Sequence, residues 1–574
     1  MKKTNVALVT FLLFLLSVTA LFAQPAILSN KDIFTPVQAK NGMVVTNDRI
    51  ATEIGLDVLK KGGNAVDAAV TVGLVMAVTM PRAGNIGGGG FMLIYSAKEK
   101  KVIAIDYREK APSASHRDMF LNKGGEVDSE LSRFSHLSAG VPGTIAGFAL
   151  ALERYGTIPL KEALAPAIKL AKKGFIVSPD FAGDIKKAAT RLKKWPSSRK
   201  LFFKADGSFY EPGDRFIQKD LTKTLKTIAK KGIKGFYEGD VAHLIESQMK
   251  QYGGLITKVD LKAYRPAVRM AVHGSYRAYD IFSMSPPSSG GVHIIQLLNI
   301  LEGYDIASLG HNSAATIHLM AEAMKHVYAD RSKYLGDPDF TDIPVAGLTD
   351  KDYAKMIRNK INDTKPMSSK EIQPGIPPGY ESNETTHYSI VDSEGNAVSN
   401  TYTINFSFGS GIVVDGAGFL LNNEMDDFSA KPGVPNAYGL IGGAANAIEP
   451  QKRMLSSMSP TIVVKEGKPV IITGSPGGSR IITTTLQVLM NIIDHGMNIQ
   501  EAVNAVRIHH QWLPDEIRAE EGLSPDTLRL LKSMGHTVAI KNAMGAASSI
   551  FIDNDNSLLY GAADARRSGL AAGY

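Results

Sequence analysis

The stretch that decides the fold is residues 383–392, which read Asn-Glu-Thr-Thr-His-Tyr-Ser-Ile-Val-Asp. Two threonines open an alternating run with β-branched residues, which predicts a half-buried strand. A cut before Thr385 would turn this threonine into an N-terminus with its own base, since a free α-amine titrates at about 7.7 to 8.0. The Thr385 hydroxyl could start that cut by attacking the carbonyl of Glu384. By itself, however, the decapeptide is also what any half-buried strand looks like, so the other motifs must decide.

The segments on either side of this strand are compatible with cleavage of the chain before Thr385. Residues 363–383 are polar and rich in proline and glycine, which predicts a surface segment that can be broken without unravelling a core. Residues 397–403 form a second strand-like run after the short turn 393–396, which predicts a hairpin.

Helical patterns and strands alternate along the chain. Residues 48–61 have helical spacing, and residues 64–78 predict a second helix that begins at Asn64 and is apolar nearly all round, as in a helix between layers. A later helix begins at Ser524-Pro525 and ends at Gly535, before a strand at 537–540. Mixed helices and hairpins favour an α+β layered architecture.

The N-terminus and the composition predict an exported protein. Lys2-Lys3, an apolar run from Val6 to Leu16 and the small residues before Gln24 form the three-part pattern of a secretory signal over residues 1–23. A retained N-terminal anchor is the alternative. No later run reaches the ~18 apolar residues that a membrane span needs. We expect a periplasmic protein, with secretion into the medium as the alternative.

Composition excludes several kinds of chemistry. The 574 residues contain no cysteine, which excludes disulfides, thiol nucleophiles and thiolate metal sites. The formal charge of +8 falls to +6 without Lys2 and Lys3, and the remaining basic residues are interspersed with acidic ones. This pattern predicts a solvated surface and no nucleic-acid or polyanion site.

The sequence contains two glycine-rich segments, and they predict different roles. Residues 474–480, Gly-Ser-Pro-Gly-Gly-Ser-Arg, lead into an amphipathic helix over 481–493. Such a loop presents unpaired N–H groups at the positive end of a helix dipole, which in an acyl-transfer enzyme can hold an oxyanion. A simple tight turn is the alternative, and the lack of a Gly-Lys-Ser/Thr ending excludes a nucleotide P-loop. Gly87–Gly90 lacks dinucleotide-binding spacing and predicts close backbone packing.

Other polar motifs fit an amino-acid ligand. Residues 422–428, Asn-Asn-Glu-Met-Asp-Asp-Phe, concentrate acceptors that could hold an ammonium group, or calcium, although EF-hand spacing is missing. Arg108 offers a bidentate fork for a carboxylate, or a surface ion pair. Ser456-Ser457 places two hydroxyls between apolar residues, as a strand end also would. His509-His510 could suggest zinc, but adjacent strand residues point to opposite faces and no third ligand is evident, so we interpret both as structural.

Taken together, these strings resemble the γ-glutamyltransferases, or γ-glutamyltranspeptidases, of the N-terminal nucleophile hydrolase superfamily. The resemblance covers essentially all of residues 47–574. Its most specific motifs are residues 385–389, 422–429, 455–461 and 474–480.

The resemblance implies a precursor that cuts itself between Glu384 and Thr385. A signal peptide over 1–23 would be followed by a large subunit, 24–384, and a small subunit, 385–574. The two would remain a heterodimer in one interwoven αββα sandwich with four layers.

The resemblance also implies a role for each site residue. Thr385 would be the nucleophile, Thr403 would hydrogen-bond it, and the N–H groups of Gly477 and Gly478 would form the oxyanion hole. For His387 we favour a structural role.

The remaining implied residues bind substrate. The α-carboxylate of a glutamyl group would meet Arg108, Ser456 and Ser457. Its α-ammonium would meet Asn405, Glu424 and Asp427. A lid over residues 431–453 would carry Tyr438 at its tip.

The expected substrates are γ-glutamyl donors such as glutathione, with water, an amino acid or a dipeptide as acceptor, and neither a cofactor nor a metal is expected. A glutaryl or cephalosporin acylase with the same machinery is the alternative enzyme. From another class, an exported amino-acid or peptide-binding protein would share the signal and the zwitterion-binding residues but would remain one polypeptide.

Overall fold

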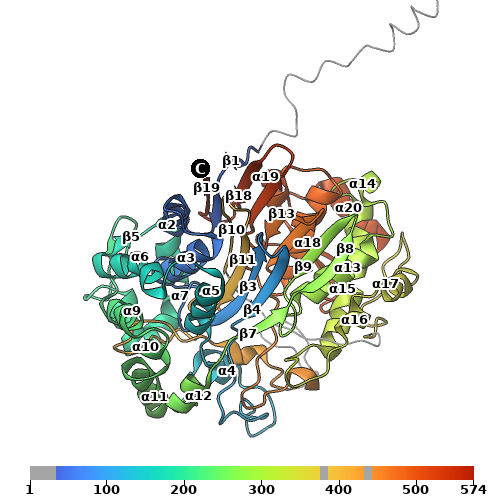
Figure 1. Ribbon diagram of the computed structural model, residues 1–574. Coiled ribbons are helices and arrows are strands. Elements are labelled where there is room, and N and C mark those ends of the chain that lie inside the picture. Colours follow the sequence, from blue (N-terminus) through green and yellow to red (C-terminus); the bar gives the residue numbers. More distant parts are fainter. Residues whose placement is uncertain (1–33, 375–385, 432–442) are drawn as a thin grey trace, which may run out of the picture. The chain divides into compact units, whose positions relative to one another are not determined.

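The computed structural model of the protein describes residues 34–374, 386–431 and 443–574 (Figure 1). The chain forms a short N-terminal unit, Met1–Thr35, and a main unit, Pro36–Tyr574. The fold described below is that of the main unit.

Two seven-stranded sheets form its centre, and neighbouring strands in both are antiparallel. The first sheet, in spatial order, contains β1 (Val37–Ala39), β18 (Leu558–Ala563), β17 (Ser548–Asp553), β13 (Lys468–Thr473), β12 (Thr461–Lys465), β9 (Tyr279–Ser283) and β8 (Val272–Tyr276). The second contains β19 (Leu570–Gly573), β2 (Met43–Thr46), β10 (Thr386–Val391), β11 (Ala397–Thr403), β3 (Gly89–Ser96), β4 (Lys101–Asp106) and β7 (Ala267–Met270). Two small sheets contain β14 (Ile508–His509), β15 (Ile517–Glu520) and β16 (Val538–Lys541), and β5 (Phe175–Ile176) and β6 (Arg215–Phe216).

Helices cover the outer faces of the sheets. Those of the first half are α2 (Arg49–Lys60), α3 (Ala65–Thr79), α4 (Ser129–Phe134), η2 (His136–Ser138), α5 (Thr144–Tyr155), α6 (Leu160–Lys173), α7 (Pro179–Lys194), α8 (Pro196–Phe202), α9 (Lys219–Lys231), α10 (Lys234–Tyr237), α11 (Asp240–Tyr252) and α12 (Lys258–Ala263). The others are α13 (Gly290–Leu301), α14 (Ile306–Leu309), α15 (Ala314–Tyr334), α16 (Val345–Leu348), α17 (Lys351–Arg358), η3 (Glu424–Asp427), η4 (Ala444–Asn446), α18 (Arg480–Ile493), α19 (Ile499–Asn504) and α20 (Pro525–Met534).

Three apolar cores separate four layers. One core lies between the two sheets, one joins the second sheet to α3, α5 and α6, and one joins the first sheet to α13, α15 and α18 (Figure 1). The strands supply neighbouring cores alternately, because successive side chains point to opposite faces: Val44 belongs to the helix-facing core and Val45 to the core between the sheets. The predicted αββα sandwich of the α+β class is confirmed.

The position of helix α3 in the fold explains why its sequence is apolar nearly all round. Asn64 caps it, and every residue from Ala65 to Thr79 is buried. The helix packs against α2 and α6 on one side and against β10 and β11 on the other. A helix enclosed in this way has no polar face to present to water, as its sequence predicts. The predicted helices over 48–61, 481–493 and 524–535 are also confirmed.

The hairpin β10–β11 is confirmed and is anchored by its turn. Oδ1 of Asp392 accepts hydrogen bonds from the N–H groups of Glu394 and Asn396, both at 2.9 Å. Its Oδ2 accepts from the N–H of Ala65, at 2.9 Å, at the start of α3. The same carboxylate therefore shapes the turn and joins it to the buried helix.

Strands from the two ends of the chain are interleaved in both sheets. In the second sheet, β10 lies between β2 and β11, and β11 pairs with β3. In the first, β9 pairs with β12, and β1 pairs with β18. A break between residues 374 and 386 would therefore leave two polypeptides in one shared core. Across the described residues, no helix has the length and apolar character needed to cross a membrane.

Candidate active site

The site lies where β11 ends, at the buried residue Thr403. β10 begins at Thr386, which pairs with Tyr402. The carbonyl of Thr403 accepts a hydrogen bond from Nδ2 of Asn85 at 2.8 Å. A Cβ added to Gly88 would collide with this carbonyl oxygen. The predicted close packing of the glycine run is thus confirmed, and it brings the backbone before β3 against the end of β11.

Arg108 follows β4 and is 1% exposed. Its Nη1 lies 2.6 Å from Oε2 of Glu424, and its Nη2 donates to Asp427. Nε and Nη2 also donate to the carbonyls of Met454 and Leu455, both at 3.1 Å. This burial excludes the surface ion pair considered from the sequence. The structure thus brings together the proposed carboxylate-binding arginine and two of the proposed ammonium-binding acids.

The electrostatics of this group involve a third acid, Glu109, which the sequence analysis missed. Glu109 is fully buried, and its Oε2 lies 3.5 Å from Nη1 of Arg108. Burial and the neighbouring Glu424 raise the pKa of Glu109, and burial and Glu424 likewise raise the pKa of Asp427, against the opposing effect of Arg108. Burial lowers the pKa of Arg108, but Glu424 and Asp427 outweigh it and raise this pKa. The guanidinium is therefore always charged, while the surplus carboxyl groups can hold a proton. No sequence pattern distinguishes Glu109 from an ordinary exposed acid.

Asn405 adopts a strained backbone beside this group. Its φ of 67° lies in the left-handed region, which non-glycine residues rarely occupy. Its N–H donates to Oγ1 of Thr403 at 2.7 Å, and its Nδ2 donates to the carbonyl of Asn423 at 3.0 Å. Its Oδ1 is buried and has no hydrogen-bond partner within the described parts of the chain. Burial raises the pKa of Glu424, while Arg108 and the hydroxyl of Thr403 oppose that rise. Thr403, Asn405 and Glu424 thus belong to one network.

Ser456 and Ser457 follow the two carbonyls that bind Arg108, and both serines are buried. The N–H of Ser456 donates to the carbonyl of Pro287 at 2.9 Å, and its Oγ accepts from the N–H of Met458 at 3.2 Å. The segment is therefore fixed on both sides. This arrangement leaves little freedom for the two serines relative to Arg108.

Asn446 is a second residue that the sequence analysis missed. Its Nδ2 donates to the carbonyl of Asp427 at 2.8 Å, and its Oδ1 accepts from the N–H of Leu455 at 3.1 Å. One amide thereby joins the segment that carries the acids to the segment that carries the serines. Its place inside the lid-like stretch 431–453 was the only sequence signal for it.

The glycine loop between β13 and α18 has the backbone that its sequence demands. Gly477 and Gly478 have φ values of 135° and 73°, which other residues rarely adopt. A Cβ added to Gly474 would lie 2.6 Å from the ring of His387. The loop therefore rests against β10 one residue beyond its first residue, Thr386. A 14-residue helix begins directly after the loop, at Arg480.

His387 is enclosed by hydroxyl groups. Its Nδ1 lies 2.8 Å from Oγ1 of Thr401, and its Nε2 lies 3.1 Å from Oγ of Ser389. Burial lowers the pKa of His387 to about 3, so the ring is neutral at physiological pH. The geometry is that of a positioning side chain, which agrees with the structural role favoured from the sequence.

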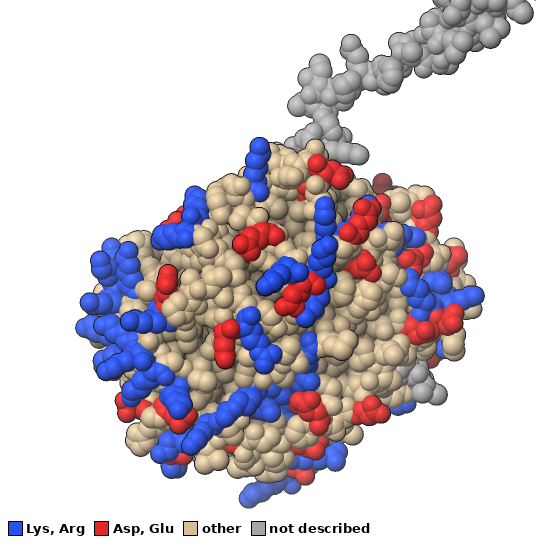
Figure 2. Space-filling view, viewed as in Figure 1, with Lys and Arg blue, Asp and Glu red and all other residues tan. Residues whose placement is uncertain are grey.

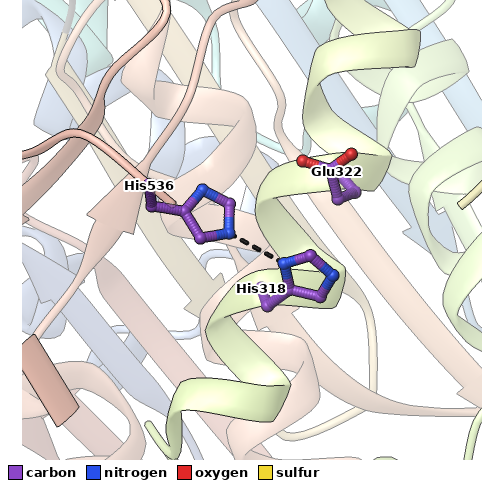
Figure 3. Close-up of side chains that lie close together, drawn as sticks. All are labelled: His318, Glu322 and His536. Carbon is purple, nitrogen blue, oxygen red and sulfur yellow. Dashed lines mark hydrogen bonds between the residues drawn. The ribbon is translucent and has the colours of Figure 1, made fainter. Parts of the chain in front are cut away.

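A histidine cluster away from this site has the residue types of a metal centre. His318 and Glu322 of α15 and His536 offer ligand atoms within 4.8 Å of one another (Figure 3). Nδ1 of His318 lies 2.7 Å from Nε2 of His536, whereas bonds of about 2.0 Å to one tetrahedral zinc ion would hold two nitrogens about 3.3 Å apart. Nζ of Lys325 lies 2.9 Å from Oε1 of Glu322, so the ammonium of this lysine already provides the positive charge that pairs with the carboxylate. The cluster is built as a hydrogen-bonded one, and we assign no metal to it.

The cluster instead ties the segment before residue 375 to the helices. Nε2 of His318 lies 2.6 Å from the carbonyl of Asn362, and Lys325 donates to the carbonyl of Met367 at 2.7 Å. The N–H of Met367 donates to Oε2 of Glu322 at 3.0 Å.

The acidic residues of 422–428, which were the candidate ligands for calcium, are engaged with other side chains. Glu424 and Asp427 pair with Arg108, and Asp426 accepts from Ser132 at 2.6 Å. His509 and His510 are buried in separate hydrogen bonds, as interpreted from the sequence.

Three predicted positions lie outside the described residues. Thr385 and Glu384 belong to the stretch 375–385, and Tyr438 belongs to the stretch 432–442. The predicted signal over 1–23 also lies outside them.

Comparisons with known proteins agree with this architecture. The sequence model of the gamma-glutamyltranspeptidase family matches residues 51–574. The glutathione hydrolase proenzyme of Escherichia coli (strain K12) is 55% identical over 545 residues, which cover 95% of this chain and 94% of that protein. A cephalosporin acylase structure from Bacillus halodurans has a TM-score of 0.85 at 28% identity and covers 96% of this chain and 99% of that one. The γ-glutamyltranspeptidase structure from Helicobacter pylori has a TM-score of 0.57 at 48% identity and covers 61% of this chain and 97% of that one. The chain belongs to the gamma-glutamyltranspeptidase family.

Proposed function

We propose that this protein is a γ-glutamyltransferase and glutathione hydrolase with Thr385 as its nucleophile. One observation carries the substrate assignment: a buried arginine, Arg108, contacts two buried acids, Glu424 and Asp427, next to the end of β11. Family membership and the 55% identity to a glutathione hydrolase proenzyme support the reaction class.

The recognition chemistry follows from the shape of the substrate. A γ-glutamyl group carries a carboxylate and an ammonium on one carbon, so the groups that bind them must lie close together. Arg108, with Ser456 and Ser457, would bind the carboxylate. The ammonium would be bound by Asn405, Glu424 and Asp427.

Arg108 is paired with Glu424 and Asp427, and the raised pKa values of Glu109 and Asp427 allow the surplus carboxyl groups to hold a proton. Substrate exchanges these contacts for its own two charges, so few charges are left unpaired in either state. Oδ1 of Asn405, which lacks a hydrogen-bond partner among the described residues, offers a further acceptor for the ammonium.

Activation begins with the chain itself. The Thr385 hydroxyl attacks the carbonyl of Glu384, the peptide C–N bond breaks, and an ester and a free amine result. Water then hydrolyses the ester, which leaves a carboxylate on Glu384 and an N-terminal Thr385. The products are the large subunit 24–384 and the small subunit 385–574, which remain paired because their strands are interleaved.

Turnover repeats the same chemistry on substrate. The α-amine of Thr385 accepts the hydroxyl proton while the oxygen attacks the γ-carbonyl. The N–H groups of Gly477 and Gly478 stabilise the oxyanion, and Thr403 hydrogen-bonds the nucleophile. The leaving amine takes the proton, and a γ-glutamyl ester remains. Water releases glutamate, or the amine of an amino acid or dipeptide takes the glutamyl group; Tyr438 would screen the ester as part of the lid.

The place of action is proposed from the N-terminal pattern. Export through the signal over residues 1–23 would deliver the enzyme to the periplasm, or to the medium. It would meet glutathione there and needs no cofactor.

Substrate preference tests the function. We expect γ-glutamyl anilide to be cleaved with a kcat/KM about 100-fold or more above that of glutaryl anilide, because the latter lacks the ammonium and leaves buried acids unpaired. In Asp427→Asn the ratio of the two kcat/KM values should fall, because kcat/KM for γ-glutamyl anilide decreases while kcat/KM for glutaryl anilide changes little. Initial rates at several concentrations give both ratios. A native preference for glutaryl anilide would support the acylase alternative.

The pH profile tests the base. We expect the acidic limb of kcat/KM to follow the α-amine, near pH 7 to 8, because His387 with a pKa of about 3 is already neutral across that range. In His387→Gln, kcat should fall as the glycine loop loses its support, while the limb stays in place. The limb is read from rates between pH 5 and 9, with Ser389→Ala as the control that removes one hydroxyl beside the ring. Disappearance of the limb in His387→Gln would make the histidine the base.

A further inference from the structure

The basic residues of this chain are concentrated in one part of it. Residues 160–234 carry 19 Lys and Arg against 7 Asp and Glu, a net charge of +12, whereas the whole chain carries +8 and the remainder therefore −4. Figure 2 shows Lys and Arg gathered at the left of the view, where α6 and α9 lie in Figure 1. Basic residues thus outnumber acidic ones on this face, although several of them pair with acids there.

Between α6 and α9 lies a groove with a volume of about 710 Å³. Its walls are lysines from both helices: Lys161, Lys169, Lys172, Lys173, Lys226 and Lys230. Its apolar lining is Ala165, Ile168 and Ala229, and none of the residues that line it is acidic. We call this surface the lysine groove.

The six lysines form no salt bridge in the parts of the chain that the structure describes, although Asp57 and Glu162 line a neighbouring pocket with Lys169 and Lys173. All six are exposed. By contrast, Lys223 of α9 pairs with Asp220 at 2.9 Å. Like charges held together without partners repel one another, and this repulsion is relieved when an anionic surface approaches.

Three exposed isoleucines lie two or three residues from an end of α6 or α9 along the sequence. Ile176 follows α6 and is 52% exposed, Ile217 is 40% exposed, and Ile233 follows α9 and is 45% exposed. Ile176 pairs with Arg215 across β5 and β6, and a Cβ on Gly174 would lie 2.7 Å from Ile217. Apolar tips beside lysines are typical of surfaces that bind lipid headgroups and the outer acyl region, whereas single-stranded nucleic acid is bound by aromatic platforms.

We propose that the lysine groove docks on a bilayer that carries anionic phospholipid headgroups. The lysines bind the phosphates, and Ile176, Ile217 and Ile233 enter the interfacial layer. This surface is separate from the residues proposed for acyl transfer, so the inference stands independently of the proposed function.

Vesicle co-sedimentation of the purified full-length protein tests the proposal. The vesicles contain phosphatidylcholine alone, or phosphatidylcholine with 30 mol% (about one in three lipids) phosphatidylglycerol, which gives an anionic surface. We expect binding that depends on phosphatidylglycerol and weakens at least about tenfold when salt rises from roughly 50 to 300 mM. The N-terminal run with Lys2 and Lys3 is the same in every variant, so its own binding to anionic vesicles cancels when the variants below are compared with the native chain.

Two variants, each with four lysines replaced by glutamate, distinguish binding by the lysine groove from an effect of the net charge of the protein. Replacing Lys169, Lys172, Lys226 and Lys230 by glutamate should weaken binding at least about 50-fold. The matched control reverses the exposed lysines Lys98, Lys100, Lys465 and Lys468 and should change binding less than about threefold. Cleavage of γ-glutamyl anilide should be equal in both variants, which shows that both fold.

Substitution of the isoleucines distinguishes binding to a bilayer from binding to a soluble polyanion. Ile176→Ser with Ile217→Ser should weaken vesicle binding about tenfold and leave heparin binding unchanged. Equal losses in the two charge reversals would overturn the proposal. So would tight binding to heparin or DNA without binding to anionic vesicles, which would make the face a polyanion site.

Discussion

Thr385→Ala is expected to yield a folded protein of uncut length whose γ-glutamyl anilide cleavage falls by at least about 10⁴-fold. The single hydroxyl is proposed both to break the bond after Glu384 and to carry the glutamyl group, so its loss removes both steps. The core should survive, because β10 keeps its pairing with β11 from Thr386 onward and with β2 from Tyr388 onward. A denaturing gel, N-terminal sequencing and the anilide assay measure the three outcomes.

The neighbouring threonine provides the control. Thr386→Ala removes a hydroxyl that is buried without a hydrogen-bond partner in the described ranges, one residue further along. This variant should be cut and active, and Thr385→Ser should recover part of both steps. A Thr385→Ala protein that still matures into two fragments would remove the nucleophile assignment. If the native protein itself remains one full-length band, the exported binding protein becomes the better interpretation.

Arg108→Lys is expected to raise KM for γ-glutamyl anilide about 100-fold while kcat stays within about threefold. The guanidinium serves four acceptors at once, namely Glu424, Asp427 and the carbonyls of Met454 and Leu455. A lysine ammonium keeps the charge but cannot reproduce that planar fork. Steady-state kinetics give the two constants, and a gel showing two fragments demonstrates that processing is intact.

Arg277→Lys is the matched control, because Arg277 has a similar set of partners elsewhere. It contacts Asp494 at 3.3 Å and the carbonyls of Glu302 and Tyr304 at 3.0 and 2.6 Å. Its replacement should alter stability alone and leave KM unchanged. An unchanged KM in Arg108→Lys would contradict its role in binding the α-carboxylate.

Local patterns accounted for the elements that could be predicted. The capping residue Asn64 and the run of apolar residues after it specify α3, because a helix without a polar face must be enclosed. The hairpin is encoded by alternating residues and by a turn with Gly395 at a φ of 83°. Each of these signals acts over a few neighbouring residues.

The features that escaped prediction depend on residues distant in sequence. Glu109 matters because 315 positions later the chain supplies Glu424, whose charge raises its pKa. Asn446 matters because it joins Asp427 to Leu455. The lysine groove exists because α6 and α9 pack together and align their outer faces.

The sequence by itself determined the secondary structure near the site and the residue types that carry the chemistry, since these follow from periodicity, caps and motifs. Tertiary structure alone decided that Arg108 meets Glu424 and Asp427, that a third acid joins them, and that lysines of α6 and α9 line one groove. The physical reason is that charge interactions depend on distance and burial in space, and residues such as Arg108 and Glu424, far apart in the sequence, meet only in the folded chain.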